Sequence, residues 1–159
     1  MTVRRELRPR DVEAIAAMHG ETYGREYSVN SNFGGDVVRN LEAAVDSGWP
    51  ERGSVWLVEH DGELAGSLAL TEESAGVACV RWFLLVPAVR GGGLGRRLVT
   101  ELVSEADAAG YELVHLMTFS ELRAAAHIYR TLGFEVTGSR EDDRWGRPLT
   151  LQTYERRRP

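Results

Sequence analysis

The sequence predicts a single α/β domain, spanning residues 1–159, in which helices pack on a mixed β-sheet. Its length is the usual size of one domain. Apolar residues recur at helical spacing in some segments and at strand spacing in others. The predicted elements follow the order α-α-β-β-β-α-β-α-β-β, which indicates one mixed sheet covered by helices.

Two helices are expected before the first strand. The first begins near Asp11, a good capping residue, and its apolar stripe is Val12, Ile15, Ala16 and His19. We expect residues 20–33 to hold the end of this helix and a loop. A second helix carries Val38, Leu41 and Val45, and Gly48-Trp49-Pro50 ends it.

Three strands are expected next. Residues 54–59 and 64–71 read as strands, and Asp61-Gly62 between them is a two-residue hairpin signal. Residues 77–86 form a long run rich in β-forming side chains that ends at Pro87.

The second half of the chain alternates helix and strand. A helix is expected where Leu94, Leu98, Leu102 and Ala106 recur every four residues, with its end at Gly110. A strand over residues 111–118, a helix over 125–132 and strands over 134–138 and 149–154 follow. We expect Arg156, Arg157 and Arg158 to form a solvated tail.

Composition and charge narrow the class of protein. The 19 Lys and Arg residues against 24 Asp and Glu residues give a net charge of −5, which argues against a general nucleic-acid binder. Cys79 is the single cysteine, which excludes an intrachain disulfide and a Cys-rich zinc site. The chain opens without a signal peptide and has no apolar run of membrane length. We therefore expect a cytoplasmic protein without metal, nucleic-acid or membrane partners.

The most informative segment joins the strand ending at Val86 to the helix beginning near Leu94. Its glycines are Gly91, Gly92, Gly93 and Gly95, and its cations are Arg90, Arg96 and Arg97. Glycine lets the backbone approach a ligand, and the first amides of a helix bind anions. We infer a phosphate or pyrophosphate site, with a glycine-rich turn without a ligand as the alternative. The spacing fits neither a P-loop nor a dinucleotide-binding fingerprint.

Two motifs in this chain resemble those of the GNAT acyltransferases (GCN5-related N-acetyltransferases). Arg90-x-x-Gly93-x-Gly95 matches the Arg/Gln-x-x-Gly-x-Gly/Ala motif of that family, and Ala125-x-x-x-Tyr129-x-x-x-Gly133-Phe134 matches its second signature. The resemblance covers nearly the whole chain. A narrower likeness, to the acetyltransferase half of MarR–GNAT fusion proteins, rests on Glu26-Tyr27, Arg81, Trp145-Gly146 and Gln152 to Glu155. The winged-helix half of those proteins has no counterpart here, so no DNA binding is carried over.

The resemblance implies a GNAT-like acyl-CoA N-acyltransferase fold, with a mixed central sheet, helices on both faces and splayed fourth and fifth strands. It implies acetyl-CoA as co-substrate and no metal. Tyr129 would be the general acid that protonates the CoA thiolate, against the plainer interpretation of Tyr129 as core packing. The residues that would bind acetyl-CoA are Phe83, Leu84, Leu85, Arg90, Gly91, Gly92, Gly93, Leu94, Gly95, Arg96 and Ser120. Ser120 would replace an Asn of the family, since this chain has Leu122 at that position.

The implied reaction is acetyl transfer from acetyl-CoA to a primary amine by direct attack. Glu21, Glu26 and Tyr27 would line the acceptor side and suit a cationic amine, with a hydrophobic cap as the alternative. The strand over residues 77–86 lacks the carboxylate that serves many members as base. Glu21, Glu26, Glu112, His115 and bulk water stay open as the base.

Three further points stay open at this stage. A non-catalytic acyl-CoA sensor or interaction module is the alternative function. The sequence does not identify the small-molecule or peptide amine acceptor, and the resemblance leaves a homodimer open. We expect Cys79 to be an inert core thiol and His19 a core histidine with satisfied hydrogen bonds.

Overall fold

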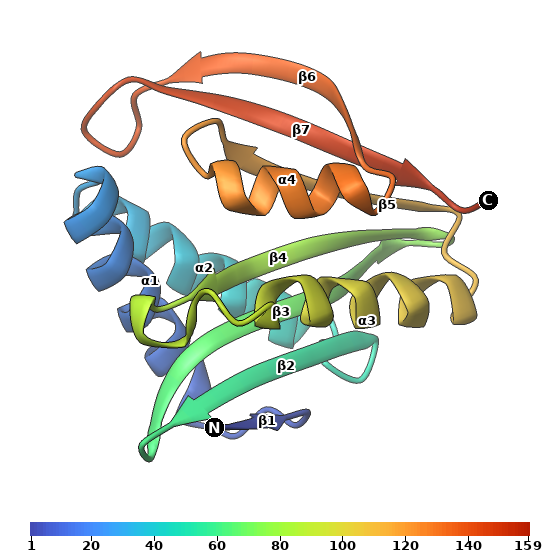
Figure 1. The fold of residues 1–159 in the computed structure, drawn as a ribbon, viewed down its shortest axis with the longest axis horizontal. Helices are drawn as coiled ribbons and strands as arrows, with labels where there is room; N and C mark the ends of the chain where they lie inside the picture. The colour runs from blue at the N-terminus through green and yellow to red at the C-terminus, as the bar shows by residue number, and fades with distance from the viewer.

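A computed structural model describes residues 1–159 and contains a seven-stranded sheet with four α-helices (Figure 1). The elements are β1 (Thr2–Arg4), α1 (Asp11–Tyr27), α2 (Ser31–Asp46), β2 (Gly53–His60), β3 (Glu63–Ser74), β4 (Val77–Leu85), α3 (Leu94–Ala108), β5 (Leu113–Phe119), α4 (Arg123–Thr131), β6 (Glu135–Asp142) and β7 (Leu149–Arg157). The strand order is β1-β2-β3-β4-β5-β7-β6. Only the β4–β5 pair is parallel, so the prediction of a mixed sheet is confirmed.

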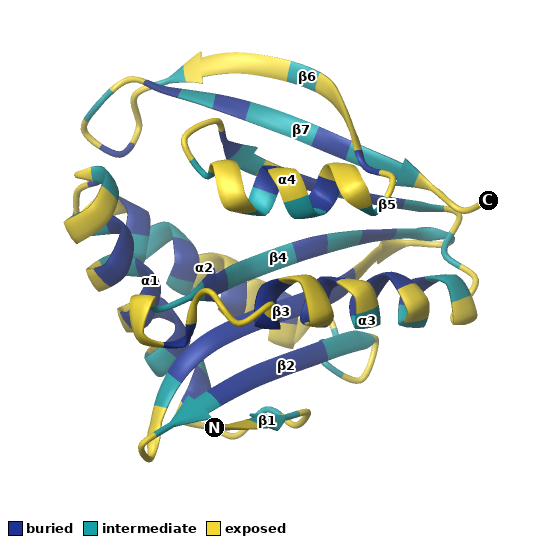
Figure 2. Ribbon diagram, viewed as in Figure 1, coloured by how far each residue is buried: buried dark blue, intermediate teal, exposed yellow.

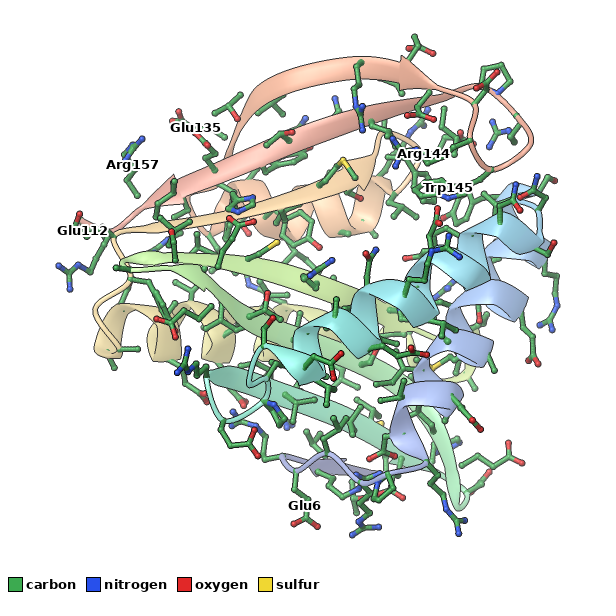
Figure 3. The ribbon with its side chains drawn as sticks, turned by 180° about the vertical axis from the view of Figure 1, so that it is seen from behind. Glu6, Glu112, Glu135, Arg144, Trp145 and Arg157 are labelled. Carbon is green, nitrogen blue, oxygen red and sulfur yellow. The ribbon has the colours of Figure 1, made fainter.

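Helices cover both faces of the sheet, with α1 and α2 on one side and α3 and α4 on the other (Figures 1 and 3). Strand β2 illustrates how one strand contributes to the cores on both faces, because its side chains alternate between the faces. Trp56 and Val58 pack in the core under α3 and α4, whereas Val55 and Leu57 pack in the core under α1 and α2. Burial is greatest in the central strands, and β6 is an exposed edge (Figure 2).

The parallel strands β4 and β5 separate soon after they meet. They pair only at Val77 with Leu113, Ala78 with Val114 and Cys79 with His115. Strand β4 stays paired with β3 as far as Leu85, and β5 stays paired with β7 as far as Phe119. The expected splay of the fourth and fifth strands is therefore present when the short β1 is counted as the first strand.

The first two helices are longer than the sequence indicates, because α1 continues to Tyr27 and α2 begins at Ser31. Two glycines allow this. A Cβ added to Gly20 would lie 3.8 Å from the Cα of Gly34, so the two helices approach closely where both residues lack side chains. Residues 20–33 do hold the end of this helix and a loop, as expected, but the loop is only residues 28–30, because interhelical contact compensates for the low helix propensity of glycine.

The ends of the chain also differ from expectation. Strand β1, which pairs with β2, is too short to give a periodic signal. Strand β7 continues to Arg157, so the expectation of a solvated tail is wrong for Arg156. The Arg156 side chain is only 10% exposed and forms an ion pair with Asp107 at 2.8 Å. Its Nε also donates to the carbonyl of Leu132 at 3.0 Å.

The β2–β3 connection confirms the hairpin signal. Asp61 and Gly62 both have positive φ, at 52° and 79°, as a type I′ turn requires. The other end of this hairpin is more constrained. Gly53 has φ +137°, and a Cβ there would lie 2.0 Å from the carbonyl oxygen of Leu70.

We expect Gly53→Ala to destabilise the fold far more than Gly62→Ala. The Gly62 Cβ would meet nothing within 4 Å, so that variant should lose only about 1–2 kcal/mol of unfolding free energy from its positive φ. Gly53→Ala should lose about 4 kcal/mol or more, because backbone must move as well. Urea denaturation of the two variants measures this, and equal losses would contradict the geometry.

Candidate active site

A cavity of about 700 Å³ lies where β4 and β5 separate. Its floor includes Cys79 to Phe83 of β4 and His115 to Phe119 of β5, and Tyr129 of α4 also lines it. Residues of α1 and α2 form one wall, and Arg144 and Trp145 of the β6–β7 loop lie at its edge (Figure 3). The Trp145 ring nitrogen donates to Asp36 of α2 at 2.7 Å, so this loop is attached to the wall.

A β-bulge shapes the floor of the cavity. Trp82 has φ +50°, and the register shifts so that Leu68 of β3 faces both Trp82 and Phe83. The Ser67 hydroxyl donates to the Trp82 carbonyl at 2.6 Å, which holds the bulge. Its effect is that Trp82 packs under α1 and α2, while Phe83 packs on the opposite side of the sheet with α3 and α4.

The glycine-rich segment before α3 leaves backbone donors free. None of the amides from Gly91 to Arg96 donates a hydrogen bond within the chain. A Cβ placed on Gly91, Gly92 or Gly93 would meet nothing within 4 Å, so these amides border open space. Consecutive free amides at a helix N-terminus suit a phosphate group. Gly95 serves packing instead, because a Cβ there would lie 3.2 Å from the Phe83 ring.

Arg90 and Glu26, which the resemblance implies on opposite sides of the site, form one ion pair. The guanidinium of Arg90 donates to both carboxylate oxygens of Glu26 at 2.7 and 2.6 Å, and its Nε donates to the Leu85 carbonyl at 2.8 Å. This contact holds the pKa of Glu26 below its ordinary value. The pair therefore ties the glycine-rich segment to the last turn of α1 and the end of β4.

Tyr129 reaches the cavity from the α3 and α4 side of the sheet. Its side chain packs between Phe83, Phe134 and Tyr154, and the residue is 4% exposed. Burial raises the pKa of its hydroxyl far above the ordinary value. That hydroxyl has no partner in the chain and is not fully enclosed, whereas the unpartnered hydroxyl of Tyr154 is. Tyr129 thus offers a protonated donor at the cavity surface.

His19 is a core histidine, but only half of its hydrogen bonds are satisfied. The residue is 3% exposed and lies 2.8 Å from the Ile15 carbonyl through Nδ1. Because a carbonyl only accepts, Nδ1 carries the proton and Nε2 a lone pair. Burial lowers the pKa of the ring to about 4, so it is neutral near pH 7. Nε2 has no partner, and His19 lines the cavity. The periodicity of the sequence indicated that His19 is buried but not that its Nε2 lacks a partner or that it borders a cavity.

Of the four side chains considered as base, only His115 lines the cavity. Its Nε2 contacts the carboxylate of Glu73, which also lines the cavity and orients the ring. His115 and Cys79 face each other in the last β4–β5 pair, at the point where the strands separate. Burial raises the pKa of the Cys79 thiol to about 11, so this thiol is protonated near neutral pH.

The three residues expected on the acceptor side do not line the cavity. Glu21 is exposed, Glu26 binds Arg90, and Tyr27 packs on Phe119. Ser120 is exposed and donates its amide to the Thr150 carbonyl at 2.9 Å.

Two general features of the structure bear on partners. The chain holds no group of three or more His, Cys, Asp or Glu side chains that would bind a metal ion. No helix combines the length and the hydropathy that crossing a membrane requires.

Fold and site define an acyltransferase of the acyl-CoA-dependent class, and comparisons with known proteins agree. Residues 51–136 match the family model described as an acetyltransferase (GNAT) domain. The chain is 28% identical over 137 residues to the uncharacterized N-acetyltransferase YjgM of Escherichia coli (strain K12), covering 84% of this chain and 81% of that protein. An N-acetyltransferase of Staphylococcus aureus Mu50 has the same fold, with TM-score 0.75, 16% identity and 99% coverage of both chains.

The chain belongs to the GNAT acetyltransferase family. It is an acetyltransferase, and enzymes of this family use acetyl-CoA as co-substrate. One neighbour, yncA of Salmonella typhimurium, was solved with acetyl-CoA as its cofactor; it has TM-score 0.67 and 19% identity, covering 99% of this chain and 94% of that one. The narrower likeness to MarR–GNAT fusion proteins is not shown by these matches and stays a prediction.

We expect Gly92→Asp to weaken acetyl-CoA binding without harming the fold. Gly92 has an ordinary φ and open space around a Cβ, so the chain tolerates a side chain while the new carboxylate would repel a phosphate. Acetyl-CoA at 100 times its Kd should stabilise the unaltered protein by about 2.7 kcal/mol, or roughly 5–10 °C in Tm. Gly92→Asp should lose most of that shift.

Gly92→Asn is the matched control, because it adds the same bulk without the charge and should keep more of the shift. Thermal unfolding with and without acetyl-CoA measures all three proteins. An undiminished shift in Gly92→Asp would place the phosphates elsewhere.

Proposed function

We propose that the protein transfers the acetyl group of acetyl-CoA to a primary amine by direct attack. One observation carries this: the cavity where β4 and β5 separate is lined by Tyr129 from one side of the sheet and by His115, held by Glu73, from the other. A proton donor and a proton acceptor around one opening are what amide formation from a thioester needs.

The donor half of the site follows from the unpaired backbone. Beyond Cys79 the edge of β4 that faces β5 lacks a strand partner, and we assign the pantetheine arm to the backbone of Phe83, Leu84 and Leu85 there. The free amides from Gly91 to Arg96 would hold the pyrophosphate. Arg90 and Glu26 would act as positioning residues, because their ion pair fixes this segment against α1.

The reaction balances with the groups present. The amine nitrogen forms a bond to the thioester carbonyl carbon, and the carbon–sulfur bond breaks. Tyr129 donates a proton to the departing sulfur, and His115 takes a proton from the nitrogen. The products are an N-acetylated amine and free CoA, and solvent restores both side chains.

Burial of Tyr129 affects its proposed role as general acid. Because burial raises the pKa of the hydroxyl, Tyr129 stays protonated across neutral and moderately alkaline pH. The same dry surroundings raise the basicity of a thiolate released there, which favours transfer of the proton to sulfur. Ionisation of Tyr129 should therefore not limit the rate at alkaline pH.

We expect Tyr129→Phe to lower kcat by about 10²–10⁴-fold while the KM for acetyl-CoA changes little. The control is Tyr154→Phe, which removes a hydroxyl from the adjacent buried ring, 5.8 Å away between centroids, without touching the cavity. Tyr154→Phe should keep full activity. Full activity of Tyr129→Phe across the pH range would remove the acid role.

We expect His115→Gln to lower kcat by about 10²-fold or more, because the proton on the attacking nitrogen loses its acceptor. Glu73→Gln should cause a smaller loss, since it disturbs only the orientation of the ring. His127 is exposed on α4 outside the cavity, so His127→Gln is a control that should match the unaltered enzyme. Steady-state rates of thiol release test this. Equal rates for His115→Gln and the control would indicate a water relay instead.

The proposed function itself is tested by release of free thiol from acetyl-CoA over a broad amine panel, with the acetylated product identified by mass. Turnover that depends on a primary amine supports the proposal. Tight acetyl-CoA binding without turnover on any amine would favour the sensor alternative.

A further inference from the structure

Arg81 is a cation in the cavity without an acidic partner. Its side chain is half-buried, lines the cavity, and makes no ion pair or hydrogen bond within the chain. None of the acidic residues that line the cavity pairs with Arg81: Glu73 contacts His115, Asp36 binds Arg39, and Glu72 makes no ion pair. Arg144 is paired with Asp142 at 2.7 Å, and Arg52 also lines the cavity without an acidic partner. A half-buried guanidinium without a counter-ion has lost part of its hydration without gaining an acidic partner.

The bulge in β4 explains how Arg81 is held. Because Trp82 takes positive φ, its ring lies on the same side of the sheet as Arg81, and the guanidinium stacks over that ring at 4.8 Å. The ring of Trp49, which lies just after α2, packs against the Trp82 ring with centroids 5.1 Å apart. A stacked guanidinium keeps its donors at its edge, which is the geometry that binds a planar carboxylate through two hydrogen bonds.

Arg81 is also close to the proposed reaction centre. It follows Cys79 by two residues on the same face of β4, which is about 7 Å along the strand. Cys79 pairs with His115, the residue assigned to take the proton from the attacking amine. A single small molecule would therefore reach both groups, with its amine near His115 and an anionic group on Arg81.

We propose that the acceptor is a small amine that also carries a carboxylate, of the amino-acid class, and that Arg81 binds this carboxylate. The inference rests on the proposed function. It replaces the cationic acceptor expected from Glu21 and Glu26, because neither of these residues lines the cavity.

The test compares matched acceptors by thiol release: each amino acid, its carboxamide, and O-phosphoethanolamine as an amine with a phosphate. The unaltered enzyme should favour the free carboxylates over the carboxamides by about 10-fold or more in kcat/KM, since a charged hydrogen bond is lost in the amide. Arg81→Gln should raise the KM for carboxylates by about 10–100-fold and leave the KM for acetyl-CoA and the rates with carboxamides unchanged.

Two further variants complete the design. Arg81→Lys keeps the charge but not the planar fork and should recover part of the preference. Arg157→Gln removes an exposed arginine at the far end of β7 (Figure 3) and should match the unaltered enzyme.

Each outcome decides between the proposals. Equal turnover of acids and amides, or an unchanged preference in Arg81→Gln, overturns the carboxylate acceptor and leaves the acetyltransferase mechanism standing. Preference for O-phosphoethanolamine over every carboxylate overturns the choice of a carboxylate in favour of a phosphate. Absence of turnover with every amine overturns both proposals.

Discussion

The site depends on how few hydrogen bonds join β4 to β5. A parallel pair that continued to the end of both strands would close the sheet, and every backbone group would have a partner. Here the pairing stops at Cys79 and His115, and each strand keeps only its outer neighbour. The remaining length of β4 therefore has an unpaired edge inside the fold, which one extended ligand can complete. Side chains from opposite faces of the sheet then meet across one opening.

The properties of the side chains at that opening have two origins: the local backbone geometry of β4, and burial by elements that are distant in the sequence. The bulge at Trp82 is local, and it changes which side chains face the cavity without altering the sheet elsewhere. Burial around Tyr129 and His19 is a distant effect, because helices packed from both sides remove water from each ring. One consequence is that the cavity combines the hydroxyl of Tyr129, which stays protonated, with the imidazole ring of His19, which stays neutral near pH 7.

Local signals in the sequence were sufficient for most of the fold and for the glycine-rich segment with free amides before α3. The Asp61-Gly62 hairpin and the free amides before α3 depend on neighbours in the chain, so residue type and spacing reveal them. Pairings between distant residues gave no such signal. Glu26 binds Arg90 across 64 positions and Arg156 binds Asp107 across 49, and neither pairing follows from any periodic pattern. In the cavity, the contact of His115 with Glu73 likewise joins residues 42 positions apart, so no periodic pattern indicates it.

The ion pair between Glu26 and Arg90 also determines the electrostatic character of the glycine-rich segment. Arg97 is paired with Glu101 at 3.2 Å, so Arg96 is the one cation there without an acidic partner. An anion bound at this segment is held by short-range amide dipoles far more than by net charge. Mobile ions screen interactions between exposed charges and act weakly on contacts at hydrogen-bond distance. If the pyrophosphate binds at this segment as proposed, we expect the affinity for acetyl-CoA to depend little on ionic strength.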